Sequence, residues 1–155
     1  MKKTVSLVLV LAMIAVVWTG FGSAASASEA QATNNTEKAL ALISTFATGD
    51  TDTARDLLAD DYIQHNLAYG TGADAFIGSV EYLASADVKT TVNNIRAFED
   101  GNKVFLQTVY NFAGAGEQVA FDIFRFDENG KIAEHWDVME TIADQSTWQN
   151  QNGKF

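Results

Sequence analysis

The strongest constraint on the fold is a predicted hairpin near the carboxyl end of the chain. Two runs rich in aromatic and β-branched residues, 117–126 and 131–140, flank Asp127-Glu128-Asn129-Gly130. Asn-Gly between such runs predicts a tight strand reversal, because glycine accepts the positive φ that the turn needs. Side chains alternate along a strand, so His135 and Asp137 are expected on one face. That face would also carry Ala133 and Met139, and the opposite face Ile132, Glu134, Trp136 and Val138.

The partner strand of this hairpin offers a second carboxylate. The same alternation places Asp122 on one face with Phe124 and Phe126. If that face points inward, an imidazole and two carboxylates form a polar patch inside an apolar cavity. If Val119, Phe121 and Ile123 face the helices instead, Asp122 is a surface residue.

The first residues have the layout of a secretory signal peptide. Lys2 and Lys3 precede an apolar run over 5–18, and Ala25-Ser26-Ala27 fits an A-x-A cleavage site. The run is shorter than the roughly 20 residues of a spanning helix. We therefore expect residues 1–27 to be a signal peptide and 28–155 a soluble, secreted or periplasmic domain with no membrane partner after cleavage.

The composition of the remaining 128 residues limits the function classes. Removing the signal leaves 8 basic and 20 acidic residues, a net charge of −12. Phosphate binding depends on Lys and Arg, so nucleic acid and anionic membranes are disfavoured as partners. The chain has no cysteine, which excludes disulfides, thiolate catalysis and zinc-cysteine sites. The length is typical of one domain.

Helical spacing dominates the first half of the mature chain. Residues 28–33 read as a flexible lead-in, followed by a helix from Asn34, which forms a capping box with Glu37, to Gly49. Asp50 or Asp52 can cap a shorter helix that ends at Asp60-Asp61. A third helix is predicted over 73–84, after a glycine-containing loop.

Alternating patterns dominate the second half. Strands are predicted over 88–98, 103–112, 117–126 and 131–140, and the tail over 141–155 is expected to be mostly irregular. Helices followed by strands indicate an α+β fold, with about three helices packed on one face of a curved antiparallel sheet. Because the third strand is apolar on both faces, we predict a homodimer through the outer sheet face.

With these elements in place, the chain resembles the SnoaL-like polyketide cyclases of the nuclear transport factor 2-like superfamily. The resemblance rests on three segments: Tyr62-Ile63-Gln64-His65-Asn66, Asp122-Ile123-Phe124-Arg125-Phe126 and Glu134-His135-Trp136-Asp137. It covers 34–141 and implies a cone-shaped α+β domain with an internal pocket, often dimeric. The family includes ring cyclases, isomerases, dehydratases, epoxide hydrolases and proteins that only bind. Leu67 replaces a proline common in similar sequences.

The resemblance implies a pocket supplied by His65, Asn66, Asp122, His135 and Asp137. Asp137 is the first candidate for catalysis, because an apolar pocket disfavours its charged form and allows it to exchange a proton. Alternatively, Asp137 is solvated or paired with a cation at a strand end. His135 would orient Asp137 or stabilise an oxyanion, or it is a buried histidine satisfied by a neighbour. Asp122 completes the catalytic candidates.

The remaining candidates would bind substrate. On an extended segment only one of His65 and Asn66 can point inward, whereas a turn could aim both. Tyr62 and Tyr110 offer hydroxyl groups, although such aromatic residues often simply pack, and Trp136 would add an aromatic wall. Two histidines and a carboxylate could in principle bind a metal, but the spacing matches no ligand motif, and phosphate-binding loops are absent. We expect no metal and no cofactor.

Three function classes remain open. The first is a cofactor-independent acid/base enzyme, catalysing aldol-type cyclisation, isomerisation or hydrolysis of a small apolar carbonyl compound. The second is a protein that binds a small hydrophobic ligand without changing it. The third is a dimeric interaction module without a ligand. A closed pocket with an ionisable side chain whose pKa is displaced favours the enzyme, and apolar walls with one orienting hydrogen bond favour the binding protein. A filled cavity favours the interaction module.

Overall fold

Three helices precede most of the sheet in the computed structural model, which describes residues 23–155. They are α1 (Ser23–Thr48), α2 (Thr51–Leu57) and α3 (Ala73–Ser85). Helix α1 ends at Gly49, which adopts a φ of +75° and whose added Cβ would lie 2.8 Å from that of Ala84. Asp50 caps α2 by accepting a hydrogen bond of 3.0 Å from the Thr53 amide. Helices α2 and α3 confirm the predicted second and third helices, and the cap at Asp50 is one of the two that the sequence offered.

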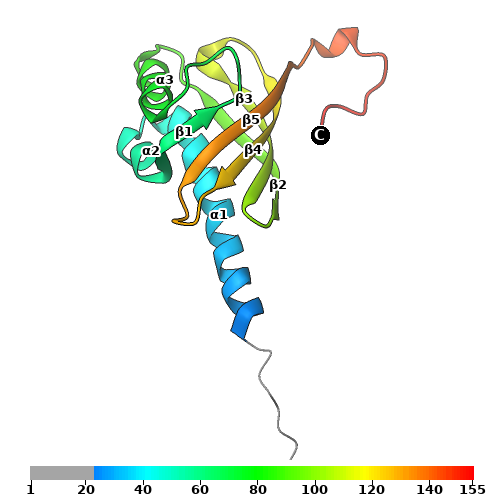
Figure 1. Ribbon diagram of the computed structural model, residues 1–155. Helices are drawn as coiled ribbons and strands as arrows, with labels where there is room; N and C mark the ends of the chain where they lie inside the picture. The colour runs from blue at the N-terminus through cyan, green and yellow to red at the C-terminus, as the bar shows by residue number, and fades with distance from the viewer. Residues whose placement is uncertain (1–22) are drawn as a thin grey trace, which may run out of the picture.

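Five strands form one twisted sheet that packs against these helices (Figure 1). The order across the sheet is β1-β5-β4-β3-β2, and every neighbouring pair is antiparallel except β1 with β5, which is parallel. The architecture is α+β and consistent with the cone-shaped fold. The strand bounds are β1 (Leu58–Gln64), β2 (Thr91–Asp100), β3 (Lys103–Asn111), β4 (Gln118–Phe126) and β5 (Ile132–Thr141).

Two boundaries at the amino-terminal end differ from the sequence prediction. Helix α1 begins at Ser23 and includes the expected lead-in over 28–33, because that segment is rich in alanine, glutamate and glutamine, which favour helix. Helix α2 ends at Leu57, and Asp60-Asp61 lie within strand β1. Strand β1 was not predicted, since its edge position leaves a pattern of buried and exposed residues without regular alternation.

A bulge in β5 changes the predicted strand phase at its first residues. Arg125 pairs with Glu134 but Phe126 pairs with Ile132, so Ala133 is inserted between them. Ile132 consequently lies in the core at 0% exposure, although strict alternation placed it on the outer face. Beyond the bulge, the predicted alternation holds, and His135 and Asp137 share the inner face with Phe124 and Asp122.

The core fills the space between the inner sheet face and α1 and α3. Its members are apolar, and the largest fully buried side chains include Leu42, Val80, Leu106, Phe124, Phe126 and Ile132. On the outer face, Phe98, Phe121 and Val138 are 63%, 55% and 73% exposed. The sheet therefore packs one face against the helices and leaves exposed apolar side chains on the other.

The carboxyl-terminal tail covers part of the outer face. Apart from the short turn η2 (Gln145–Thr147), it is irregular, and it curls back toward the sheet (Figure 1). Gln107 donates to the Lys154 carbonyl oxygen at 3.0 Å, and the Lys154 ammonium pairs with Glu140 at 2.6 Å. Gln107, Val109 and Val119 are buried although their positions alternate with inward-facing residues.

The predicted signal peptide lies mostly outside the described residues. Residues 1–22 are not described, and 23–27 belong to the first turns of α1. Within residues 23–155, no helix combines the length and apolar character that crossing a membrane requires.

Candidate functional site

A cavity of about 620 Å³ lies between the inner sheet face and helices α1 and α3. Its walls are mainly aromatic and aliphatic, with Phe46 and Phe76 packed at a ring distance of 4.9 Å. Tyr69 of the loop after β1 and Ser79 and Tyr82 of α3 add polar groups to these walls, and four of the strands contribute the remaining polar side chains. They are Gln64 of β1, Tyr110 of β3, Asp122 of β4, and His135 and Asp137 of β5.

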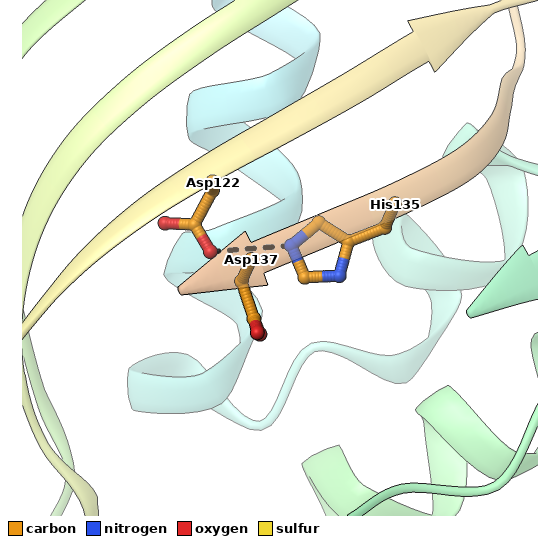
Figure 2. A group of neighbouring side chains, drawn as sticks. All are labelled: Asp122, His135 and Asp137. Atoms are coloured by element: carbon orange, nitrogen blue, oxygen red, sulfur yellow. Dashed lines mark hydrogen bonds and ion pairs between the residues drawn. The ribbon is translucent and has the colours of Figure 1, made fainter. Parts of the chain in front are cut away.

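The sheet register brings the three predicted catalytic residues together. Asp122 pairs with Asp137 across β4 and β5, and His135 lies two residues from Asp137 on the same face. His135 Nε2 lies 3.2 Å from Asp122 Oδ1, and Asp137 projects beside them (Figure 2). Asp122 and His135 are only 4% and 7% exposed. The structure thus places two carboxylates and an imidazole inside an apolar cavity.

Tyr110 is the principal neutral partner of Asp122. Its hydroxyl donates to Asp122 Oδ2 at 3.0 Å, and its side chain is buried against Phe46 and Phe112. Burial, followed by the negative charge of Asp122, raises the pKa of Tyr110 well above its ordinary value. Tyr110 therefore remains a protonated donor throughout the physiological range.

Asp137 is held by Asn66 from the loop after β1. Asn66 Nδ2 lies 2.8 and 2.9 Å from the two carboxylate oxygens. The Ala68 amide donates to Asn66 Oδ1 at 2.9 Å, which fixes the orientation of the Asn66 amide. Since this contact is neutral, Asp137 is positioned without being paired to Lys or Arg in the described part of the chain.

Gln64 lies within the segment Tyr62-Ile63-Gln64-His65-Asn66, but the sequence pattern predicted no role for it. Gln64 Oε1 lies 3.1 Å from His135 Nδ1 and accepts a hydrogen bond of 2.9 Å from the backbone N–H of Asn66. Period-two alternation from Tyr62 through Gln64 to Asn66 would have identified it, had the segment been predicted as a strand. The parallel pairing of Gln64 with His135 supplies this contact.

His65 and Trp136 lie outside the cavity, in contrast to their expected role in substrate binding. His65 Nε2 lies 2.7 Å from Glu134, and its ring stacks on Trp136 at 4.6 Å. Both residues are adjacent in sequence to inward-facing residues, so alternation turns them outward. The loop after β1 therefore aims Asn66, and not His65, toward Asp137.

Tyr62 lies next to the cavity but does not line it. It is 2% exposed, packs edge-on against Phe76, and accepts a hydrogen bond of 3.2 Å from Gln64 Nε2. Burial, with the charges of Asp137 and Asp122, raises its pKa far above the ordinary value. Tyr62 therefore stays neutral, and its hydroxyl oxygen holds the side-chain amide of Gln64 in place.

The same cluster is the place where a cation would be held, if one were bound. Donor atoms of Asp122, His135 and Asp137 lie within 4.8 Å of one another. However, His135 Nε2 and Asp122 Oδ1 face each other, and both oxygens of Asp137 contact Asn66. A cation bound through His135 Nε2 would have to displace the His135–Asp122 contact, whereas each carboxylate oxygen keeps a lone pair beside its hydrogen bond.

The arrangement has the elements of acid/base chemistry. One carboxylate, Asp137, is oriented by a neutral amide at the cavity wall. A hydrogen-bonded pair, Asp122 and His135, lies next to it and is supported by Tyr110. Both groups are within reach of one bound molecule, because both line the same cavity.

The family model for the SnoaL-like domain matches residues 39–135. A putative polyketide cyclase from Bacillus cereus ATCC 10987 is 16% identical with a TM-score of 0.63, covering 75% of this chain and 80% of its own. An LEH-like epoxide hydrolase from M. tuberculosis is 18% identical with a TM-score of 0.62, covering 71% and 85%.

IdmH, a putative polyketide cyclase from Streptomyces antibioticus, is 20% identical with a TM-score of 0.55, covering 68% of this chain and 91% of its own. These likenesses establish the shared fold. No curated protein matches the sequence. Because the family model spans more than half of the chain and the fold agrees with it, this chain belongs to the SnoaL-like domain family.

Proposed function

We propose that this protein is a cofactor-independent acid/base enzyme that acts on a small apolar carbonyl compound. The observation that carries the proposal is the position of Asp137 beside the Asp122–His135 pair in a mainly apolar cavity. Solved structures of the same fold include a putative polyketide cyclase and an LEH-like epoxide hydrolase, which supports chemistry of this general kind.

The proposed step is enolisation. Asp137 removes a proton from the carbon next to the substrate carbonyl, and the carbonyl oxygen receives a proton from the Asp122–His135 pair. Protonated Asp137 then gives its proton to another carbon of the enol, which is isomerisation, or to the oxygen of a second carbonyl that the enol carbon attacks, which is aldol-type closure. In both cases the enol O–H proton returns to the Asp122–His135 pair as the carbonyl forms again. Positioned proton transfer of this kind contributes about 10²–10⁴ in rate.

The test compares Asp137→Asn with Asp61→Asn, the same change at an exposed carboxylate of β1. Small ketones and epoxides are first screened for thermal stabilisation, and the hits are incubated with protein and followed by mass spectrometry. Asp137→Asn should lose about 10²–10⁴ in turnover and still bind the hit, whereas Asp61→Asn should retain activity. Full turnover by Asp137→Asn would remove this residue from the proposed role.

A ligand-binding protein without catalysis is the alternative that the mainly apolar walls favour. In that case, a hit would bind the wild type and be recovered unchanged. Equal binding by wild type and Asp137→Asn, with no product from any hit, would support this alternative.

We propose further that the protein is exported and forms a homodimer through the outer sheet face. Export rests on the amino-terminal sequence, and a mature chain that begins at Ser28 in a secreted or periplasmic fraction would support it. The homodimer rests on the exposed Phe98, Phe121 and Val138 of β2, β4 and β5.

A further inference from the structure

The orientation of the Gln64 side-chain amide is determined by its neighbours. A backbone N–H can only donate, so the Gln64 atom that lies 2.9 Å from the Asn66 amide nitrogen must be the carbonyl oxygen. The other end, Nε2, then donates to the Tyr62 hydroxyl at 3.2 Å. Gln64 therefore presents an oxygen, and not an NH₂ group, to His135.

This oxygen determines which nitrogen of His135 carries a hydrogen. Nδ1 lies 3.1 Å from Gln64 Oε1, and an acceptor oxygen requires a donor opposite it, so Nδ1 is protonated. Phe124 stacks on the imidazole at 4.5 Å, which holds the ring plane. Nε2 then faces Asp122 Oδ1 at 3.2 Å.

A neutral histidine with hydrogen on Nδ1 has a lone pair on Nε2. A carboxylate oxygen opposite it also has only lone pairs, so the contact requires one proton between Nε2 and Oδ1. The second oxygen of Asp122 accepts from Tyr110. The ionisable groups around His135 are Asp122 of β4, Asp137 of β5, Tyr110 of β3 and Tyr62 of β1.

We infer that Gln64 is a positioning residue that holds His135 with hydrogen on Nδ1, so that the Asp122–His135 pair carries one more proton than it otherwise would. Without the Gln64 oxygen, the ring can place its single hydrogen on Nε2 and donate it to ionised Asp122. With Gln64 present, the pair stores the proton that an acid step delivers. The catalytic meaning of this inference rests on the proposed function, but the proton position does not.

Nitrogen NMR of the histidine side chains tests the inference without a substrate. The chain has two histidines, so His65→Asn assigns the signals of His135. In the wild type near pH 7, Nδ1 of His135 should resonate as a protonated nitrogen. In Gln64→Leu it should shift to the position of a bare nitrogen. In Gln64→Glu, which keeps an acceptor oxygen, it should remain protonated.

Two results would overturn the inference. One is a bare Nδ1 in the wild type, which needs no variant and so decides the matter even if Gln64→Leu does not fold. The other is a folded Gln64→Leu protein whose Nδ1 signal is unchanged. A failed search for turnover would count against the proposed enzyme and leave the NMR result standing, so the two failures are distinguishable.

Discussion

Replacing Tyr110 by phenylalanine should lower the stability of the fold by removing one hydrogen bond to a buried carboxylate. The ring stays, so its packing against Phe46 and Phe112 is retained. What is lost is the 3.0 Å contact from the hydroxyl to Asp122 Oδ2, in a side chain only 2% exposed. The substitution therefore isolates a polar interaction of the site.

The expected cost follows from the charge of the acceptor. Hydrogen bonds to charged groups contribute about 1.5–3 kcal/mol, and Asp122, 4% exposed, cannot replace the lost donor with bulk water. We expect the free energy of unfolding of Tyr110→Phe to fall by about 1.5–3 kcal/mol. For a domain of this size, Tm should fall by roughly 3–5 °C for each kcal/mol.

Urea unfolding followed by far-ultraviolet circular dichroism at pH 7 measures the change. The matched control is Tyr82→Phe, because Tyr82 is 73% exposed and loses the same hydroxyl. The free energy of unfolding of the control should lie within about 0.5 kcal/mol of the wild-type value. The slope of the unfolding free energy against urea concentration should be the same in both variants as in the wild type. If Tyr110→Phe also lies within that range, the Tyr110–Asp122 contact does not stabilise the site as argued.

Two other predictions concern the outer sheet face. Hydrogen bonds from His65 and Arg125 lower the pKa of Glu134. Ionised Glu134 therefore stabilises the fold at pH values above 4.5, the ordinary pKa of the carboxyl group. This stabilisation is lost as the pH falls through the lowered pKa. Glu134→Gln should therefore cost about 0.5–1 kcal/mol at pH 7 and nothing in strong acid, and an equal cost at both pH values would contradict this assignment. Val138→Glu should convert the proposed homodimer to a monomer in analytical ultracentrifugation, with Val88→Glu as the control at another exposed valine; a monomeric wild type would refute the dimer.

Local patterns predicted the helices and most strands because their signals are contained within a few neighbouring residues. The Asn129-Gly130 turn has its predicted geometry, with Gly130 at a φ of +71°. His135 and Asp137 share a face because they lie two residues apart beyond the bulge at Ala133, which changes the phase that the turn alone would set. The inward position of Asp122 was one of two stated alternatives, and the burial of Phe124 beside it selects that alternative.

The amino-acid sequence by itself determined the family, the α+β class and the shared face of His135 and Asp137, since hydrophobic alternation and turn chemistry act over short distances. Only the tertiary structure decided that β1 pairs in parallel with β5. That pairing joins residues about 70 positions apart, and it alone brings Gln64 to His135 and Asn66 to Asp137. No periodic pattern encodes such a contact, because its partners are selected by the closing of the sheet edge and not by their neighbours in the chain.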